Sequence, residues 1–127
     1  MTRWGDMNKE SVIYVLSVKF SLRVIEMGRY LLEKYARDKI LPILVHQVVR
    51  CGTSIGANVS ESLAAQSTAD HVSKLKISLK EGDETRYWLE LLNKAGYLND
   101  TEYQSIDNDN SILNGTLVNM INKNLNK

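Results

Sequence analysis

The residues of this chain that are best suited to metal or nucleophilic chemistry are His46, His71 and Cys51. A di-metal carboxylate centre in a helical bundle needs Glu-x-x-His pairs that project into the core. Three residues before the two histidines the chain has Ile43 and Thr68 in place of glutamate. A single cysteine cannot supply a zinc ligand set. We therefore expect no metal site and no cofactor.

Cys51 is also the only candidate thiol nucleophile. It falls in an apolar stripe at helical spacing, where a cysteine usually behaves as a small, inert hydrophobic residue. Neither histidine is spaced to lie beside it on the same helix. Gly52 and Gly56 lack the lysine and the strand–turn context of a phosphate-binding loop. The sequence therefore predicts no catalytic residue, and a hydrolase or nuclease is the weakest functional hypothesis.

Small residues recur every four positions at Gly52, Gly56 and Ser60. Each glycine costs up to about 1 kcal/mol in a helix relative to alanine. We therefore expect another backbone to approach this strip closely. Packing within one chain and contact between subunits both remain open.

Two polar groups also follow helical spacing: Gln47, Arg50, Ser54, Asn58 and Glu61, and then Lys80, Glu81, Glu84, Arg86 and Glu90. In one interpretation they are solvated faces, in which Lys80 pairs with Glu84 four residues on. Arg86 would pair with Glu90 in the same way. In the other, a partly buried Arg–Glu network fixes the register of two helices. Neither is favoured.

These residues must be positioned by helices, because apolar residues recur at steps of three and four along most of the chain. The pattern predicts helices over about 11–39, 43–66, 68–95 and 101–125. Short loops between them predict an all-α fold, an antiparallel up-down four-helix bundle that forms a single domain over residues 1–127. In the last helix the expected apolar positions are Leu113, Leu117, Met120 and Leu125.

Local signals support these boundaries. The run from Val12 to Val15 is rich in β-formers and leaves the first start uncertain by several residues. Pro42 suits a first helical turn. Ser67 reads as an N-cap, Gly96 as the residue that ends a helix, and Asp100 as a cap of the fourth helix.

The charge balance gives no strong case for nucleic acid or membrane as a partner, since 16 basic and 15 acidic residues leave a net charge of +1. The first helix is the basic one: residues 11–40 contain six basic and three acidic side chains, against two and four in residues 97–127. No segment has a signal-peptide layout or approaches the roughly 20 apolar residues that span a bilayer. We expect a cytoplasmic protein without membrane contact.

Residues 47–98 resemble the bacterial four-helix-bundle proteins first noted as reading frames inside 23S ribosomal RNA intervening sequences. The resemblance is carried by Gln47–Arg50, Gly52–Glu61, Ala65–Ser67, Asp70, Lys80–Thr85, Tyr87–Leu89 and Gly96–Leu98. Many members have proline where this chain has Gly56. The motif positions singled out are Gln47, Arg50, Gly52, Ser54, Gly56, Asn58, Glu61, Glu81, Glu84 and Trp88.

This resemblance implies a bundle that assembles into a ring, often a homopentamer, without enzymatic activity. It also implies a relationship to the accessory variability proteins of diversity-generating retroelements. Those relatives are basic, bind nucleic acid and associate with a reverse transcriptase.

Two functional hypotheses follow. In the first, an oligomer associates with RNA or DNA through basic residues of the first and third helices: Lys19, Arg23, Arg29, Lys34, Arg37, Lys39, Lys74 and Lys76. In the second, the protein is a structural scaffold that binds a protein partner and has no role with nucleic acid. The near-neutral charge favours the second, because phosphate binding scales with the number of phosphates neutralised.

Overall fold

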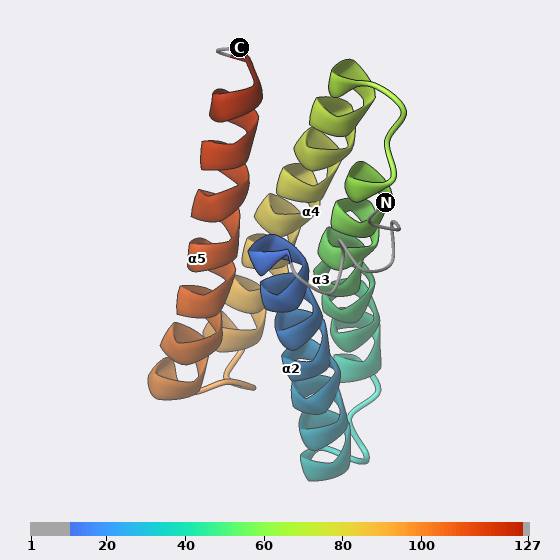
Figure 1. Ribbon diagram of the computed structural model, residues 1–127. Helices are drawn as coiled ribbons and strands as arrows, with labels where there is room; N and C mark the ends of the chain where they lie inside the picture. Colours follow the sequence, from blue (N-terminus) through green and yellow to red (C-terminus); the bar gives the residue numbers. More distant parts are fainter. Residues whose placement is uncertain (1–10, 126–127) are drawn as a thin grey trace.

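Residues 11–125, which the computed structural model describes, form four α-helices and no strand. The helices are α2 (Val12–Lys34), α3 (Leu41–Leu63), α4 (Thr68–Lys94) and α5 (Asp100–Leu125). Each packs against the next in the chain, and α5 packs against α2 (Figure 1). This arrangement confirms the predicted all-α four-helix bundle. The two ends of the predicted domain lie outside the described residues.

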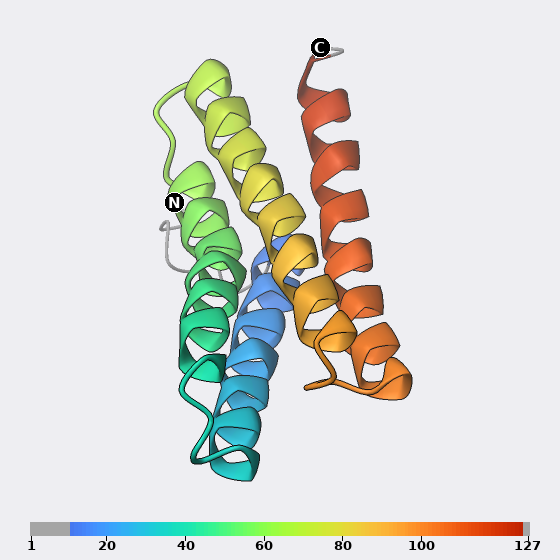
Figure 2. The same ribbon diagram turned by 180° about the vertical axis from the view of Figure 1, so that it is seen from behind.

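The helices are not level with one another. Seen from both sides, α5 continues past the start of α2 at one end, while α2 continues past the start of α5 at the other (Figure 2). None of the helices among the described residues is both long enough and apolar enough to cross a membrane.

The turn between α2 and α3 differs from the prediction. The first helix begins at Val12, capped by the Ser11 hydroxyl, so the β-rich run is helical. It ends at Lys34 and not at residue 39, and the Asp38 side chain instead binds the backbone at the start of the following helix. One Asp38 carboxylate oxygen accepts hydrogen bonds from the backbone N–H of Ile40 at 2.9 Å and of Leu41 at 3.0 Å. The second helix therefore starts at Leu41 and ends at Leu63, slightly before the predicted 43–66.

The other helix ends follow the sequence signals closely. Ser67 caps α4, its hydroxyl accepting from the backbone N–H of Asp70 at 3.1 Å. Gly96 ends α4 with φ +90°, a conformation that favours glycine. The predicted cap of α5 was wrong by one residue, because Asn99 and Glu102 cap it reciprocally at 2.8 and 2.9 Å.

The hydrophobic core takes one face from each helix. Its fully buried side chains include Val24, Leu31, Leu41, Val48, Ile55, Val59, Leu75, Leu89, Leu92 and Leu117. Burying such a side chain contributes about 1.5–3 kcal/mol relative to leaving it in water. The predicted apolar position Leu125 was wrong, since this side chain is 59% exposed at the end of α5. Two asparagines, Asn110 and Asn114, are buried on α5 instead.

Glycines bring α2 and α3 together. A Cβ atom at Gly52 would lie 3.1 Å from the Val24 side chain, and one at Gly56 would lie 3.2 Å from the Ser17 hydroxyl. Both residues thus face another helix of the same chain. This geometry supports packing within one chain for these two positions of the small-residue strip.

A second close approach joins α4 and α5. A Cβ atom at Gly82 would overlap the side-chain oxygen of Asn114 and lie 2.8 Å from its Cγ. The side chain of Asn110 donates to the Gly82 carbonyl at 3.1 Å. The Asn114 amide, although buried, has no hydrogen-bond partner among the described residues. Gly82 is therefore the position at which α5 sits most tightly on α4.

A tyrosine clasp joins the two turns at the other end of the bundle. The Tyr97 hydroxyl donates to the second carboxylate oxygen of Asp38 at 2.6 Å, and the Tyr35 and Tyr97 rings meet edge to face at 5.2 Å. The hydrogen bond from Tyr97, aided by the Leu41 amide, lowers the pKa of Asp38. The same bond raises the pKa of Tyr97. The clasp therefore favours a charged aspartate and a neutral tyrosine.

Replacing Asp38 by asparagine is expected to remove a pH-dependent part of the stability. The folded-state pKa of Asp38 lies below its ordinary value of 3.8, so its contribution is present above that pH and is lost as pH falls through the lowered pKa. The measurement is the urea midpoint of both proteins from neutral pH down to strong acid. Their difference should be largest near neutrality and should close in acid. A difference that is constant with pH would contradict this role for the carboxylate, and Tyr97→Phe serves as the matched variant on the other side of the bond.

Candidate functional site

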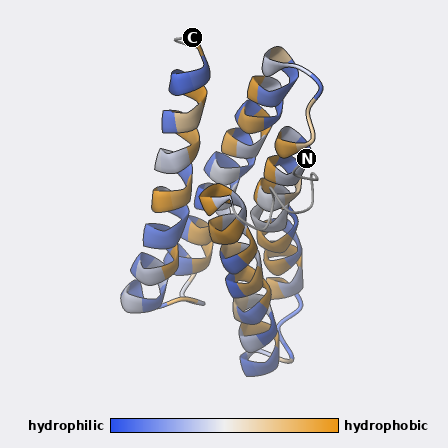
Figure 3. Cartoon of the chain, in the orientation of Figure 1, coloured by the Kyte–Doolittle hydropathy of each residue, from blue (hydrophilic) through white to orange (hydrophobic). Residues whose placement is uncertain are grey.

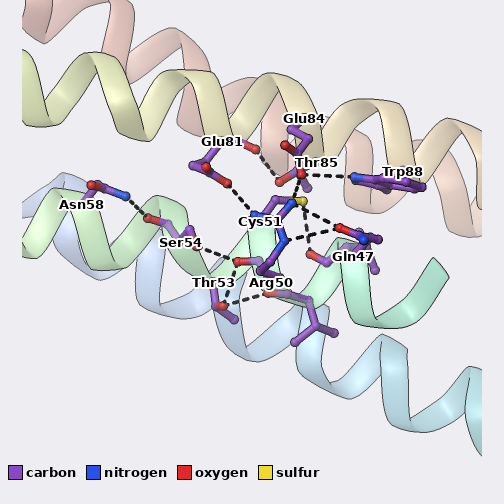
Figure 4. A network of polar contacts seen from close by, with 12 residues as sticks. Gln47, Arg50, Cys51, Thr53, Ser54, Asn58, Glu81, Glu84, Thr85 and Trp88 are labelled. Atoms are coloured by element: carbon purple, nitrogen blue, oxygen red, sulfur yellow. Dashed lines mark hydrogen bonds and ion pairs between the residues drawn. The ribbon is translucent and has the colours of Figure 1, made fainter. Parts of the chain in front are cut away.

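A polar seam runs along the outside of α3 and α4, made by Gln47 and Arg50 of α3 and by Glu81, Glu84 and Trp88 of α4 (Figure 4). Arg50 forms an ion pair with Glu81 at 3.7 Å and a close one with Glu84. These side chains are partly exposed, from 21% for Glu81 to 44% for Arg50. The seam is therefore an ionic contact between helices that solvent reaches.

Neighbouring side chains hold the seam in place. The Gln47 side-chain oxygen accepts from the Arg50 guanidinium at 3.2 and 3.3 Å. The Trp88 indole N–H donates to Glu84 at 3.3 Å. The network between helices is thus the interpretation that the structure supports. The ion pairs of residues 11–125 do not include the two predicted within α4, Lys80 with Glu84 and Arg86 with Glu90. Arg86 instead pairs with Asp107 of α5 at 3.7 Å.

The remaining motif residues do not join this network. Ser54 donates to the Arg50 carbonyl at 2.7 Å and Asn58 donates to the Ser54 carbonyl at 2.9 Å, both along α3. Glu61 pairs with Lys74 of α4 at 3.6 Å. Because Gly52 and Gly56 face α2, the motif divides into a packing face and a polar face.

The side chains considered for chemistry are separated in space. Cys51 is buried, its thiol contacts the Val48 carbonyl at 3.6 Å, and burial raises its pKa. A raised thiol pKa leaves little thiolate at neutral pH. His71 contacts the Ser62 carbonyl at 2.7 Å, and His46 is exposed. Residues 11–125 contain no group of three or more His, Cys, Asp or Glu side chains placed to hold a metal ion.

The eight basic residues predicted to bind nucleic acid lie in different surroundings. Arg23 bridges to α5, where it binds the Asp109 carboxylate at 2.5 Å and the Ser105 hydroxyl at 2.6 Å. Lys74 is engaged by Glu61. Lys19 and Lys76 are exposed on separate helices.

The other four gather at one end of the bundle. We call the basic end the group on the last turns of α2 and the loop that follows, at the lower end in Figure 1: Arg29, Lys34, Arg37 and Lys39. All four are exposed. The Lys34 ammonium lies 5.6 Å from the centre of the Tyr30 ring and 5.4 Å from that of Tyr35. The basic end therefore combines cations with aromatic surface.

An apolar surface lies on the outer side of α2. This outer face consists of Val12, Val15, Val18 and Leu22, of which Leu22 is 55% exposed. Hydrophobic residues show on the outside of α2 in Figure 3. A row of exposed aliphatic side chains on one helix is the composition of a protein contact surface.

Sequence reasoning missed the tyrosine clasp and the Arg23 bridge to α5. Asp38 was predicted to lie inside the first helix, so its hydrogen bonds to the start of the next helix were not expected. No sequence pattern links Asp38 to Tyr97. Asn110 could have been found, because it lies four residues after Ile106 and three before Leu113, on the same helical stripe.

The fold and the seam define the class of the protein, which is an all-α bundle whose two central helices are joined by a surface ionic network. The model of the family described as 23S rRNA-intervening sequence protein matches residues 9–119. The chain belongs to this family. That assignment confirms the resemblance drawn from residues 47–98.

A solved relative has the same fold. It is a protein of unknown function from the S23 ribosomal protein family of Bacteroides thetaiotaomicron, with a TM-score of 0.80 and 39% sequence identity. The match covers 87% of this chain and 98% of that one. A comparison with curated proteins finds no match.

Proposed function

We propose that this protein is a non-enzymatic, self-associating protein of the cytoplasm that associates with RNA through its basic end. The observation that carries the proposal is the set of four exposed cations in residues 29–39, at the end of α2 and in the loop after it, against two carboxylates, Glu33 and Asp38. None of the four forms an ion pair with a carboxylate among residues 11–125.

The chemistry of the basic end suits phosphates more than bases. Lysine and arginine side chains release counterions when they neutralise phosphates, so binding of this kind weakens steeply as salt rises. Tyr30 is 47% exposed and offers a ring on which an unpaired base can stack. We therefore expect binding that depends on salt and little on sequence. Self-association would multiply this basic surface, in the manner of the implied homopentamer.

Removing the basic end is expected to abolish most RNA retention. With Arg29, Lys34, Arg37 and Lys39 all replaced by alanine, the affinity at about 50 mM salt should fall by roughly 10-fold or more. The slope of log affinity against log salt should flatten by about 3, since each lost phosphate contact removes about 0.7–0.9. The measurement is fluorescence polarisation with a structured RNA and with poly(U). The matched control removes four exposed lysines elsewhere: Lys19, Lys76, Lys80 and Lys123. An equal loss in this control, or no binding by the unchanged protein at low salt, would refute the proposal.

Self-association is proposed through the outer face of α2. Replacing Leu22 by glutamate puts a charge on this apolar surface, and the oligomer should dissociate to monomers. Ile77→Glu is the matched control, since Ile77 is 41% exposed on α4. Light scattering after size exclusion measures the mass of each. A monomeric unchanged protein, or dissociation by both substitutions, would count against this surface.

A second candidate is a scaffold that binds a protein partner, such as a reverse transcriptase, without nucleic acid. The net charge of +1 favours it, together with the pairing of Arg23 and Lys74 by carboxylates. It predicts an oligomer that ignores RNA at every salt concentration.

A further inference from the structure

A groove runs between α2 and α5, on the side of the bundle where helices pack least closely. It consists of two hollows of about 450 and 260 Å³ that share Arg23. The larger is lined by Glu26, Met27 and Tyr30 of α2, by Leu98, and by Thr101, Glu102, Ser105 and Ile106 of α5. The smaller is lined by Leu16, Lys19, Phe20, Asp109, Ile112 and Leu113. We call the two together the α2–α5 groove.

The floor of the groove is apolar and continuous with the core. Leu98 and Ile106 are 3% exposed at the base of the larger hollow, and Phe20 is 3% exposed at the base of the smaller. Along α2 the lining extends from Leu16 to Tyr30, which corresponds to about 21 Å at 1.5 Å per residue. This length equals about four turns of a helix laid along the groove.

The rim of the larger hollow is negatively charged. Glu26 lies on the α2 side and Glu102 on the α5 side. Arg23 and Asp109 form an ion pair at 2.5 Å that bridges α2 and α5 where the two hollows meet and is neutral as a unit. The cation Lys19 lines the smaller hollow. Lys34 does not line the groove, but its charge interacts with that of Glu102. Carboxylates of both helices thus line the larger hollow, and that of Glu102 also accepts a hydrogen bond from the Asn99 backbone N–H.

We propose that the α2–α5 groove binds an amphipathic, cationic helix of a partner protein. Leucine-like side chains of that helix would cover the apolar floor, as in other helix-in-groove complexes. A lysine or arginine of the helix would lie between Glu26 and Glu102, where opposite charge is favourable in partly excluded water. RNA does not fit this surface, because its phosphates would meet the same two carboxylates. The groove is therefore a second site, which adjoins the basic end at Tyr30.

The test uses two helical peptides of about 14 residues with the same leucine pattern, one with lysine and one with glutamate at the polar positions. The lysine peptide should bind the full chain, and the glutamate peptide should bind at least about 10-fold more weakly. In the variant Glu26→Lys, which leaves the capping residue Glu102 unchanged, this preference should be lost. The matched control reverses one exposed charge on α4, Glu90→Lys, and should keep the preference of the unchanged protein.

A steric variant separates binding in the groove from general charge attraction. Thr101→Trp places a large ring at the larger hollow from an exposed position in the first turn of α5, and it should abolish binding of the lysine peptide. RNA retention by this variant should equal that of the unchanged protein. The proposal is overturned if neither peptide binds, if the preference survives charge reversal, or if the α4 control changes it equally. Loss of RNA retention in Thr101→Trp would assign the groove to RNA and overturn it as well.

Discussion

Gly82→Leu is expected to destabilise the protein by about 2–3 kcal/mol, which is a large part of the stability of an ordinary domain. At Gly82 even a Cβ atom would overlap the Asn114 side chain. The new side chain must displace the buried Asn114 side chain or push α5 away from α4, and in the second case the hydrogen bond from Asn110 to the Gly82 carbonyl is lost as well. Leucine is the better helix former by almost 1 kcal/mol, so any loss measures packing alone. Urea unfolding followed by circular dichroism gives the difference.

The same substitution at Gly115 should have the opposite sign. Gly115 lies on α5, exposed, with no atom within 4 Å of the position that a Cβ would take. Gly115→Leu should stabilise the protein by about 0.5–1 kcal/mol through helix propensity alone. If the two variants move in the same direction, Gly82 does not mark the contact between α4 and α5.

Arg50→Glu is expected to cost about 2–3 kcal/mol and to loosen the polar seam. The change removes the ion pairs to Glu81 and Glu84 and adds a third carboxylate to the same place. Each of these pairs is partly exposed, and an exposed ion pair alone contributes only about 0–1 kcal/mol. Most of the expected loss therefore comes from repulsion between like charges, and it should shrink as salt rises.

A charge exchange tests the geometry of the seam. Combining Arg50→Glu with Glu84→Arg restores opposite charges across α3 and α4, and most of the stability should return. Combining Arg50→Glu with Glu90→Arg makes the same net change at an exposed position and should rescue little. Equal rescue by both would mean that only the net charge matters.

Fold class was predictable from the sequence because the apolar period of the helices is strong and the caps are local. Ser67 and Gly96 act within one turn of their own helix, so their sequence neighbours suffice to identify them. The end of α2 was not predictable in this way. Tyr35 continues the apolar stripe, but Asp38 is drawn out of the helix by the amides of α3 and by Tyr97.

The candidate sites were only partly predictable. The spacing placed Arg50 and the α4 glutamates on helical faces. The same sequence pattern, however, allows these charges to pair within one helix or with the neighbouring helix. Only the distances across α3 and α4 decide between them. Arg23 was assigned to nucleic acid on charge alone, and its pairing with Asp109 depends on how α5 lies against α2.

The helices pack more closely on their sequence neighbours than α2 packs on α5, and this difference affects how the bundle opens. Contacts between successive helices close short loops, whereas α2 and α5 come together only when most of the chain is folded. Since this last contact is also the loosest, α2 and α5 can each detach while the α3–α4 pair stays packed. Hydrogen exchange should then be slowest in the backbone amides of α3 and α4. A helix held between α2 and α5 would slow exchange in both outer helices at once.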